Sequence, residues 1–143
     1  MPLSATAILW PLIAQVALTA AVWVALYVAR LGEMSARGID PQRVRTSQLA
    51  AGVLTNVAAA DNFRNLFEVP VLFFAAGILL AFLGHASALE LALAWAYVGL
   101  RALHSLIHLS YNRVVHRFAA YAASTLVVFA LWGLLAWDVA HAP

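Results

Sequence analysis

Residues 61–70 read Asp-Asn-Phe-Arg-Asn-Leu-Phe-Glu-Val-Pro and stand where a long apolar run begins. On a helix, which turns by about 100° per residue, the polar residues of this stretch share one face. They are Asp61, Arg64, Asn65 and Glu68. Pro70 lies inside the run, where it removes a helical hydrogen bond and kinks the helix. A polar stripe that leads into a membrane-length segment predicts a helix with one face turned towards a pocket.

The composition predicts an integral membrane protein. Of 143 residues, 65% are hydrophobic and 10% are charged, whereas soluble domains carry about 45–50% apolar and about 25% charged residues. The net charge of +2 is too small to suggest a nucleic-acid partner. The absence of cysteine excludes disulfides and zinc–sulfur sites. The first apolar run is too long for a signal peptide and lacks a basic start, so it is interpreted as a retained span.

Hydropathy predicts one all-α domain over 1–143, a bundle of four transmembrane helices at about 3–28, 66–83, 88–111 and 117–137, since about 20 apolar residues cross a bilayer. Arginines gather after the first and third spans, and the turn at Gly84 has none. The positive-inside rule therefore places both termini outside the cytoplasm of a multi-pass inner-membrane protein. The stretch 30–48 is interpreted as a polar loop; alternatively, Arg43 or Arg45 reaches an anionic ligand at the membrane surface.

The third predicted span carries Arg101 about halfway along, with polar residues in the same helical sector: His104, His108 and Tyr111. A charge at the bilayer centre costs ~2.5–3.5 kcal/mol, so such residues face the bundle interior. Glu68 is the expected partner of Arg101, in an ion pair that is either purely structural or part of a site. The i, i+4 spacing of the histidines can hold a metal, but no third ligand is evident, and no metal is expected.

The fourth predicted span adds Arg117 and Tyr121 one turn apart. The three polar patches can meet in one pocket near the cytoplasmic face. Its arginines outnumber its carboxylate, which favours an anionic, polar ligand, because arginine forks bind carboxylates in bidentate fashion.

These residues resemble a known family. Arg64-Asn65-x-x-Glu68 before Pro70, Arg101-x-x-His104, and Arg117 with Tyr121 are similar to motifs of the membrane-associated proteins in eicosanoid and glutathione metabolism (MAPEG), in particular bacterial members with no assigned reaction. The resemblance covers all four spans. It implies a homotrimer that binds glutathione between subunits.

The resemblance also implies residue roles. Glutathione would be held by Arg64, Asn65, Glu68 and His104, with Arg101 and Tyr111 added to this binding set on the shared helical sector. Arg117 would stabilise the thiolate, and Tyr121 would bind glutathione and hydrogen-bond to the thiolate or the product. Phe118 stands where prostaglandin E synthase has a serine, and Asp61 where it has an arginine.

Three functions follow as hypotheses. The first is a membrane-bound glutathione transferase that conjugates a thiol to a lipophilic electrophile from the surrounding membrane lipid. The second, favoured by Phe118 and Asp61, is a non-catalytic membrane protein whose polar patch binds a small anionic ligand or supports assembly. The third, a transporter or proton relay through the histidines, is disfavoured because four spans are few and no pair of broken helices marks two halves.

Overall fold

The computed structural model describes residues 6–84 and 86–141. Over these residues the chain is helical and has no strand, which confirms the all-α prediction. The elements are α1 (Leu9–Arg37), the 3-10 helix η1 (Pro41–Val44), α2 (Ser47–Val53), α3 (Ala58–Asn65), α4 (Pro70–Leu83), α5 (Ala88–Leu109) and α6 (Val114–Ala140).

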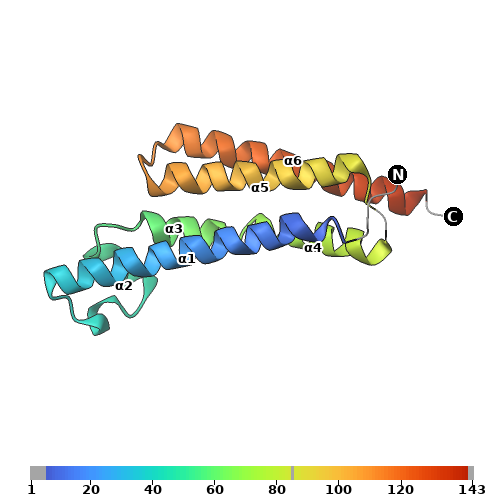
Figure 1. Cartoon of the computed structure of the whole chain (residues 1–143). Coiled ribbons are helices and arrows are strands. Elements are labelled where there is room, and N and C mark those ends of the chain that lie inside the picture. The colour runs from blue at the N-terminus through green and yellow to red at the C-terminus, as the bar shows by residue number, and fades with distance from the viewer. Residues whose placement is uncertain (1–5, 85, 142–143) are drawn as a thin grey trace.

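The long helices run roughly parallel or antiparallel to one another (Figure 1). In one layer α1 lies along α3 and α4, and in the other α5 lies along α6. The layers meet where α1 and α3 contact α5, and where α4 contacts α6. Helix α1 begins and α6 ends at the same end of the bundle, while η1 and α2 lie at the opposite end, which we call the cap end.

Three helical segments of the described chain are long and apolar enough to cross a membrane: Leu9–Arg37, Ala58–Leu83 and Val114–Ala140. Their outer faces are apolar, as Trp10, Ile78 and Leu126 illustrate, which suits contact with lipid. Helix α5 is not among the three segments, and it carries buried Glu90 and Arg101. The predicted crossing at 88–111, and with it the number four, stays a prediction.

The apolar core lies at the end of the bundle away from the cap. Phe73 of α4 stacks on Tyr97 of α5 with ring centroids 4.3 Å apart, and both side chains are fully buried. Helices α1 and α4 approach closely because position 77 is glycine: a Cβ there would lie 2.5 Å from Leu12 Cδ2. Small residues permit such close approach between membrane helices.

The prediction that Pro70 kinks the interior of one helix is wrong in detail. Helix α3 ends at Asn65, and Pro70 is the first residue of α4. Proline suits the first turn of a helix, where its missing N–H has no helical acceptor. Between the two helices the backbone bonds tighten to i→i−3 steps, such as Phe67 N–H to Arg64 O at 2.9 Å and Leu72 N–H to Val69 O at 3.0 Å. Residues 66–69 therefore form a break.

Helix α1 continues beyond its apolar part, which ends at Val28, into the stretch interpreted as a polar loop. It ends at Arg37 because Gly38 adopts the left-handed conformation with φ 59°, and its N–H bonds back to Ser35 O. Glycine accepts positive φ without the steric penalty of a Cβ.

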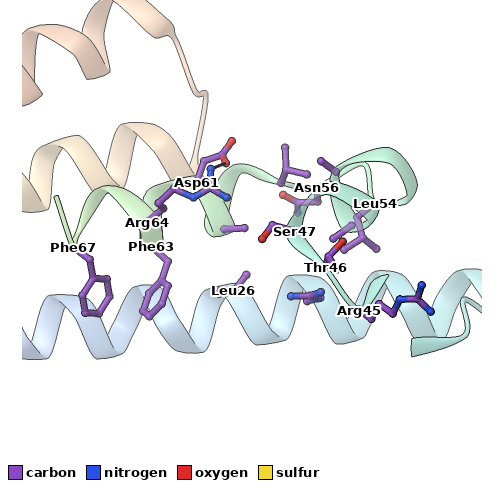
Figure 2. Close-up of a pocket in the computed structure, with 15 residues that line it drawn as sticks. Leu26, Arg45, Thr46, Ser47, Leu54, Asn56, Asp61, Phe63, Arg64 and Phe67 are labelled. Atoms are coloured by element: carbon purple, nitrogen blue, oxygen red, sulfur yellow. Dashed lines mark ion pairs between the residues drawn. The ribbon is translucent and has the colours of Figure 1, made fainter. Parts of the chain in front are cut away.

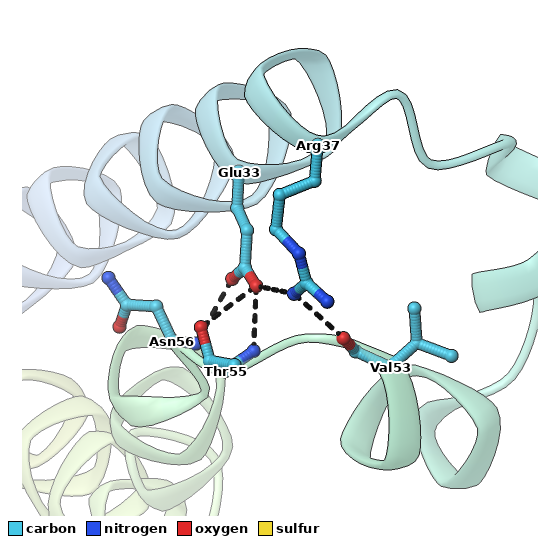
Figure 3. Close-up of polar contacts among 5 residues, drawn as sticks. All are labelled: Glu33, Arg37, Val53, Thr55 and Asn56. Atoms are coloured by element: carbon cyan, nitrogen blue, oxygen red, sulfur yellow. Dashed lines mark hydrogen bonds and ion pairs between the residues drawn. The ribbon is translucent and has the colours of Figure 1, made fainter.

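The rest of the cap is also folded. Ile39, Val44, Ala50 and Leu54 form a small buried cluster of their own. Glu33 on α1 accepts hydrogen bonds from the backbone N–H groups of Thr55 at 2.8 Å and Asn56 at 3.0 Å (Figure 3). These bonds hold the chain between α2 and α3 against α1, so the cap is not a plain loop.

Candidate functional site

A layer of buried polar side chains crosses the bundle between its apolar core and its cap. Arg101, His104 and His108 of α5 are each at most 2% exposed. Their spacing of three and four residues places them on one face of α5, as the sequence predicted. That face is turned towards α3 and α6, whose polar residues close the layer.

Arg101 is fully buried, and its expected ion pair with Glu68 is not formed. Instead, Arg101 Nη2 donates to the backbone carbonyl of Asn65 at 2.7 Å. That carbonyl is the last of α3, and the break before Pro70 leaves it without a helical donor, which explains the change of partner. The Arg101 guanidinium also lies 5.2 Å from the centre of the Tyr121 ring, a cation–π distance. Its Nε and Nη1 bond to nothing in the described part of the chain.

Arg117 joins α6 to the histidines of α5. His104 Nδ1 lies 2.9 Å from the backbone carbonyl of Arg117, so this nitrogen carries the proton and donates. Arg117 Nη1 donates to His108 Nε2 at 3.0 Å and to Asn112 Oδ1 at 2.8 Å. Asn112 takes a positive φ of 48°, a conformation that asparagine tolerates better than most residues. The turn between α5 and α6 thus delivers an acceptor to Arg117.

Glu68 and Tyr121 form the rim of the layer. The Tyr121 hydroxyl donates to Glu68 Oε2 at 3.3 Å, although the two residues are 53 positions apart. Glu68 is exposed, and Tyr121 and Arg117 are half-buried. The accessible groups are therefore a carboxylate, a phenol and a guanidinium, with the enclosed Arg101 behind them.

Two of the predicted site residues lie away from this layer. Arg64 is exposed and lies 3.7 Å from Asp61, on the side of α3 that faces the cap. The Tyr111 hydroxyl is exposed and lies 3.1 Å from His116 Nδ1, past the end of α5. The single polar face predicted for 61–70 is split, because the break after Asn65 separates Glu68 from the helix that carries Arg64.

Sequence reasoning missed two features of this region. Asn62 is fully buried, and its Oδ1 accepts a hydrogen bond from the Ser105 hydroxyl at 3.2 Å. Its place three residues before Asn65 was the available signal. The second feature is a cavity of about 610 Å³ between α1, α2 and α3, lined in part by Arg64 (Figure 2). The alternative that Arg43 or Arg45 reaches an anionic ligand concerned one of its lining residues, Arg45. The cavity itself was not predictable, because its walls come from three separate elements.

The arrangement supplies positive charge at a surface that ligands can reach. A thiolate beside Arg117 would be stabilised, because an adjacent cation favours the charged form of a thiol. Among the described residues, no group of three or more His, Cys, Asp or Glu is placed to hold a metal ion.

The family model described as the MAPEG family matches residues 8–137, nearly the whole chain. No curated protein and no solved structure matched it.

Proposed function

Because the chain belongs to the MAPEG family, we propose that it is a membrane enzyme that activates glutathione, or a similar small thiol, and conjugates it to a lipophilic electrophile. The chain is a membrane protein of a family concerned with glutathione and eicosanoid metabolism. The observation that carries the proposed transferase activity is the pairing of Arg117 with Tyr121, one turn apart on α6 and both partly accessible.

The residues at the rim fit a peptide thiol. Arg117 lies where it can stabilise a thiolate, and Tyr121 can turn its hydroxyl from Glu68 to the sulfur. Glu68 would then be free to accept from the ammonium group of the peptide, as its exposure permits. His104 Nε2 and two nitrogens of Arg101 lack partners within the described chain, so the layer has hydrogen-bonding capacity to spare.

The reaction follows from this placement. The thiol loses its proton to solvent, because the charge of Arg117 favours the anion. The sulfur attacks the electrophilic carbon, a carbon–sulfur bond forms, and the leaving group departs with the electrons of its former bond; for an aryl halide it is halide. The apolar outer surfaces of the helices let such an electrophile approach from the bilayer.

We also propose four crossings and a homotrimer, with glutathione bound at the subunit boundary, as the resemblance implies. The rim supports this assembly, because Glu68 and Phe118 are exposed beside the site. Another subunit that packed against them would form a further wall of the site. The proposed membrane is the inner membrane, with both termini outside the cytoplasm.

A non-catalytic role is the second candidate. Its support is that the rim groups already satisfy one another: Arg117 bonds to His108 and Asn112, and Tyr121 bonds to Glu68. If these bonds serve only packing, glutathione should not bind and should not stabilise the protein.

Thermal unfolding of the purified protein in detergent separates the two candidates. Millimolar glutathione, and an analogue with a methyl group in place of the thiol, should both raise the unfolding temperature. Linkage gives about 2.7 kcal/mol of stabilisation when the ligand concentration is a hundred times the dissociation constant. Glutathione should also react with an aryl halide in the presence of the wild-type protein and not of Arg117→Ala. No shift and no conjugation would favour the non-catalytic role.

A further inference from the structure

The turn between α5 and α6 is short, and Asn112 gives it its shape. Helix α5 ends at Leu109 and α6 begins at Val114. Asn112 takes a φ of 48°, and its N–H donates to the carbonyl of Ile107, in the last turn of α5, at 2.8 Å. No other described residue except glycine has a positive φ. Asparagine and glycine both tolerate this conformation, so the backbone alone does not explain why the residue is asparagine.

The side chain of Asn112 makes a bond that glycine could not make. Its Oδ1 accepts a hydrogen bond from Arg117 Nη1 at 2.8 Å. The same Nη1 also donates to His108 Nε2 at 3.0 Å. One nitrogen of the guanidinium is therefore held twice, once from the last turn of α5 and once from the turn that follows it.

These two bonds restrain Arg117 without neutralising it. The acceptors are a neutral amide and an imidazole nitrogen that has no proton, because arginine can only donate. Arg117 has no ion pair within the described residues. Its Nε and Nη2 donate to no group in the described part of the chain. The guanidinium thus keeps its full charge and one free edge for a ligand.

The restraint matters because arginine is a long side chain with many rotamers. An arginine that had to be ordered during the reaction would lose conformational entropy at that point. Donors that are already fixed where negative charge develops avoid this loss and stabilise the charge more strongly. Arg117 is half-buried at the rim, so a thiol can reach it while the turn holds it in place.

We propose that Asn112 is a positioning residue for the thiol reaction, whose side-chain oxygen fixes Arg117 at the rim and leaves the guanidinium charge available to the thiolate. The inference rests on the proposed function, in which Arg117 stabilises that thiolate. Asn112 acts through Arg117 and does not touch the sulfur. Position 112 needs a residue that accepts a positive φ and carries a neutral acceptor, and asparagine meets both requirements.

Two substitutions separate these requirements. Asn112→Gly keeps the backbone conformation and removes the acceptor. Asn112→Asp keeps an acceptor of the same length, in a residue that also tolerates positive φ, but adds a negative charge that pairs with Arg117. The matched controls are Asn56→Gly and Asn56→Asp, because Asn56 is exposed between α2 and α3 and its side chain has no hydrogen bond within the described residues.

The measurement uses the full-length protein in detergent at saturating glutathione. The pKa of the bound thiol is read from thiolate absorption against pH, together with kcat for an aryl halide and the unfolding temperature. In Asn112→Gly we expect a higher thiol pKa than in the wild type and a kcat about tenfold lower, the effect of losing one hydrogen bond to a charged group. In Asn112→Asp the thiol pKa should rise by about one unit, because the new carboxylate neutralises Arg117.

A raised thiol pKa in both Asn112 variants, with wild-type values in both controls, supports the inference. A wild-type thiol pKa in both Asn112 variants would overturn it and leave the proposed function standing. A lower kcat in Asn112→Gly with an unchanged thiol pKa would also overturn it, because Asn112 would then act only through the fold. If Asn112→Gly does not fold, the thiol pKa of Asn112→Asp decides. An ordinary thiol pKa in the wild type would instead contradict the proposed function itself.

Discussion

The Tyr121 hydroxyl donates a hydrogen bond to Glu68 Oε2 at 3.3 Å, which joins α6 to the break between α3 and α4. The bond places a phenol beside Arg117, one turn earlier on the same helix. We therefore expect the phenol to donate a hydrogen bond to the sulfur once glutathione is bound.

Tyr121→Phe should lower kcat for aryl halide conjugation by about tenfold, which corresponds to the loss of one hydrogen bond in the transition state. The helix should persist, because the ring remains over Arg101. Steady-state kinetics with glutathione in excess measure the effect. Tyr27→Phe is the control, since Tyr27 is exposed on α1 far from the rim. Equal kcat in Tyr121→Phe and wild type would remove the phenol from the mechanism.

Arg101→Met should leave the protein as stable as wild type, or more stable. The change removes a buried charge that has no ion pair among the described residues, and an apolar replacement of a buried ionic group is often neutral or stabilising. Affinity for glutathione should fall, because the positive field behind Tyr121 is lost. Thermal unfolding and a glutathione titration measure the two effects. Destabilisation beyond about 3 kcal/mol would show instead that the Asn65 carbonyl depends on this arginine.

Gly77→Ala should destabilise the bundle by about 1–3 kcal/mol, because the new methyl group would lie 2.5 Å from Leu12 Cδ2. Gly133→Ala is the matched control. It lies in a long helix with nothing within 4 Å of its Cβ position, so a gain of about 0.5–1 kcal/mol is expected. Unfolding temperatures in one detergent compare the two. If both variants change the unfolding temperature by the same amount, the effect of Gly77→Ala does not come from close packing of α1 on α4.

Much of the architecture was predictable, because hydrophobic run lengths and turn residues are local signals. Helix α5 lies within two residues of its predicted bounds, and Gly84 ends α4 as expected. The cap was not predictable in this way. Its order depends on bonds between distant positions, such as Glu33 with Asn56, and its charged sequence is also typical of a loop.

The site was predictable only in its inward face. Periodicity placed Arg101 and His104 together on α5, because both lie on one uninterrupted helix. The same rule failed for 61–70, where it assumed that the helix continued past Asn65. It also gave Arg101 the wrong partner, because charge alone pointed to Glu68 and the open carbonyl at the end of α3 has no signature in the sequence.

The cap should loosen in acid. Glu33 lies beyond the apolar part of α1, and the N–H groups of Thr55 and Asn56 lower its pKa from 4.5 to about 2. A carboxyl group with a depressed folded pKa adds stability above its unfolded pKa and loses it as pH falls towards the folded value. The protection factors of the Thr55 and Asn56 amides, which correct for the intrinsic exchange rate at each pH, should therefore fall below about pH 4.5.

Glu33→Gln should lower the protection factors of these amides already at neutral pH, because a neutral amide accepts more weakly than a carboxylate. Asp138→Asn, at the far end of α6, is the control and should leave the cap amides unchanged. Protection factors of these amides that do not change with pH in the wild type would contradict the role of Glu33.

The pKa of protein-bound glutathione tests the central claim that Arg117 stabilises a thiolate. The ultraviolet absorption of the thiolate, followed against pH at saturating glutathione, gives this pKa for wild type and Arg117→Gln. In the wild type we expect the thiol pKa to fall at least about one unit below the ordinary value of about 8.5. In Arg117→Gln it should return towards that value, with helix content unchanged by circular dichroism. An ordinary pKa in the wild type, or the same lowered pKa in both proteins, would contradict the account.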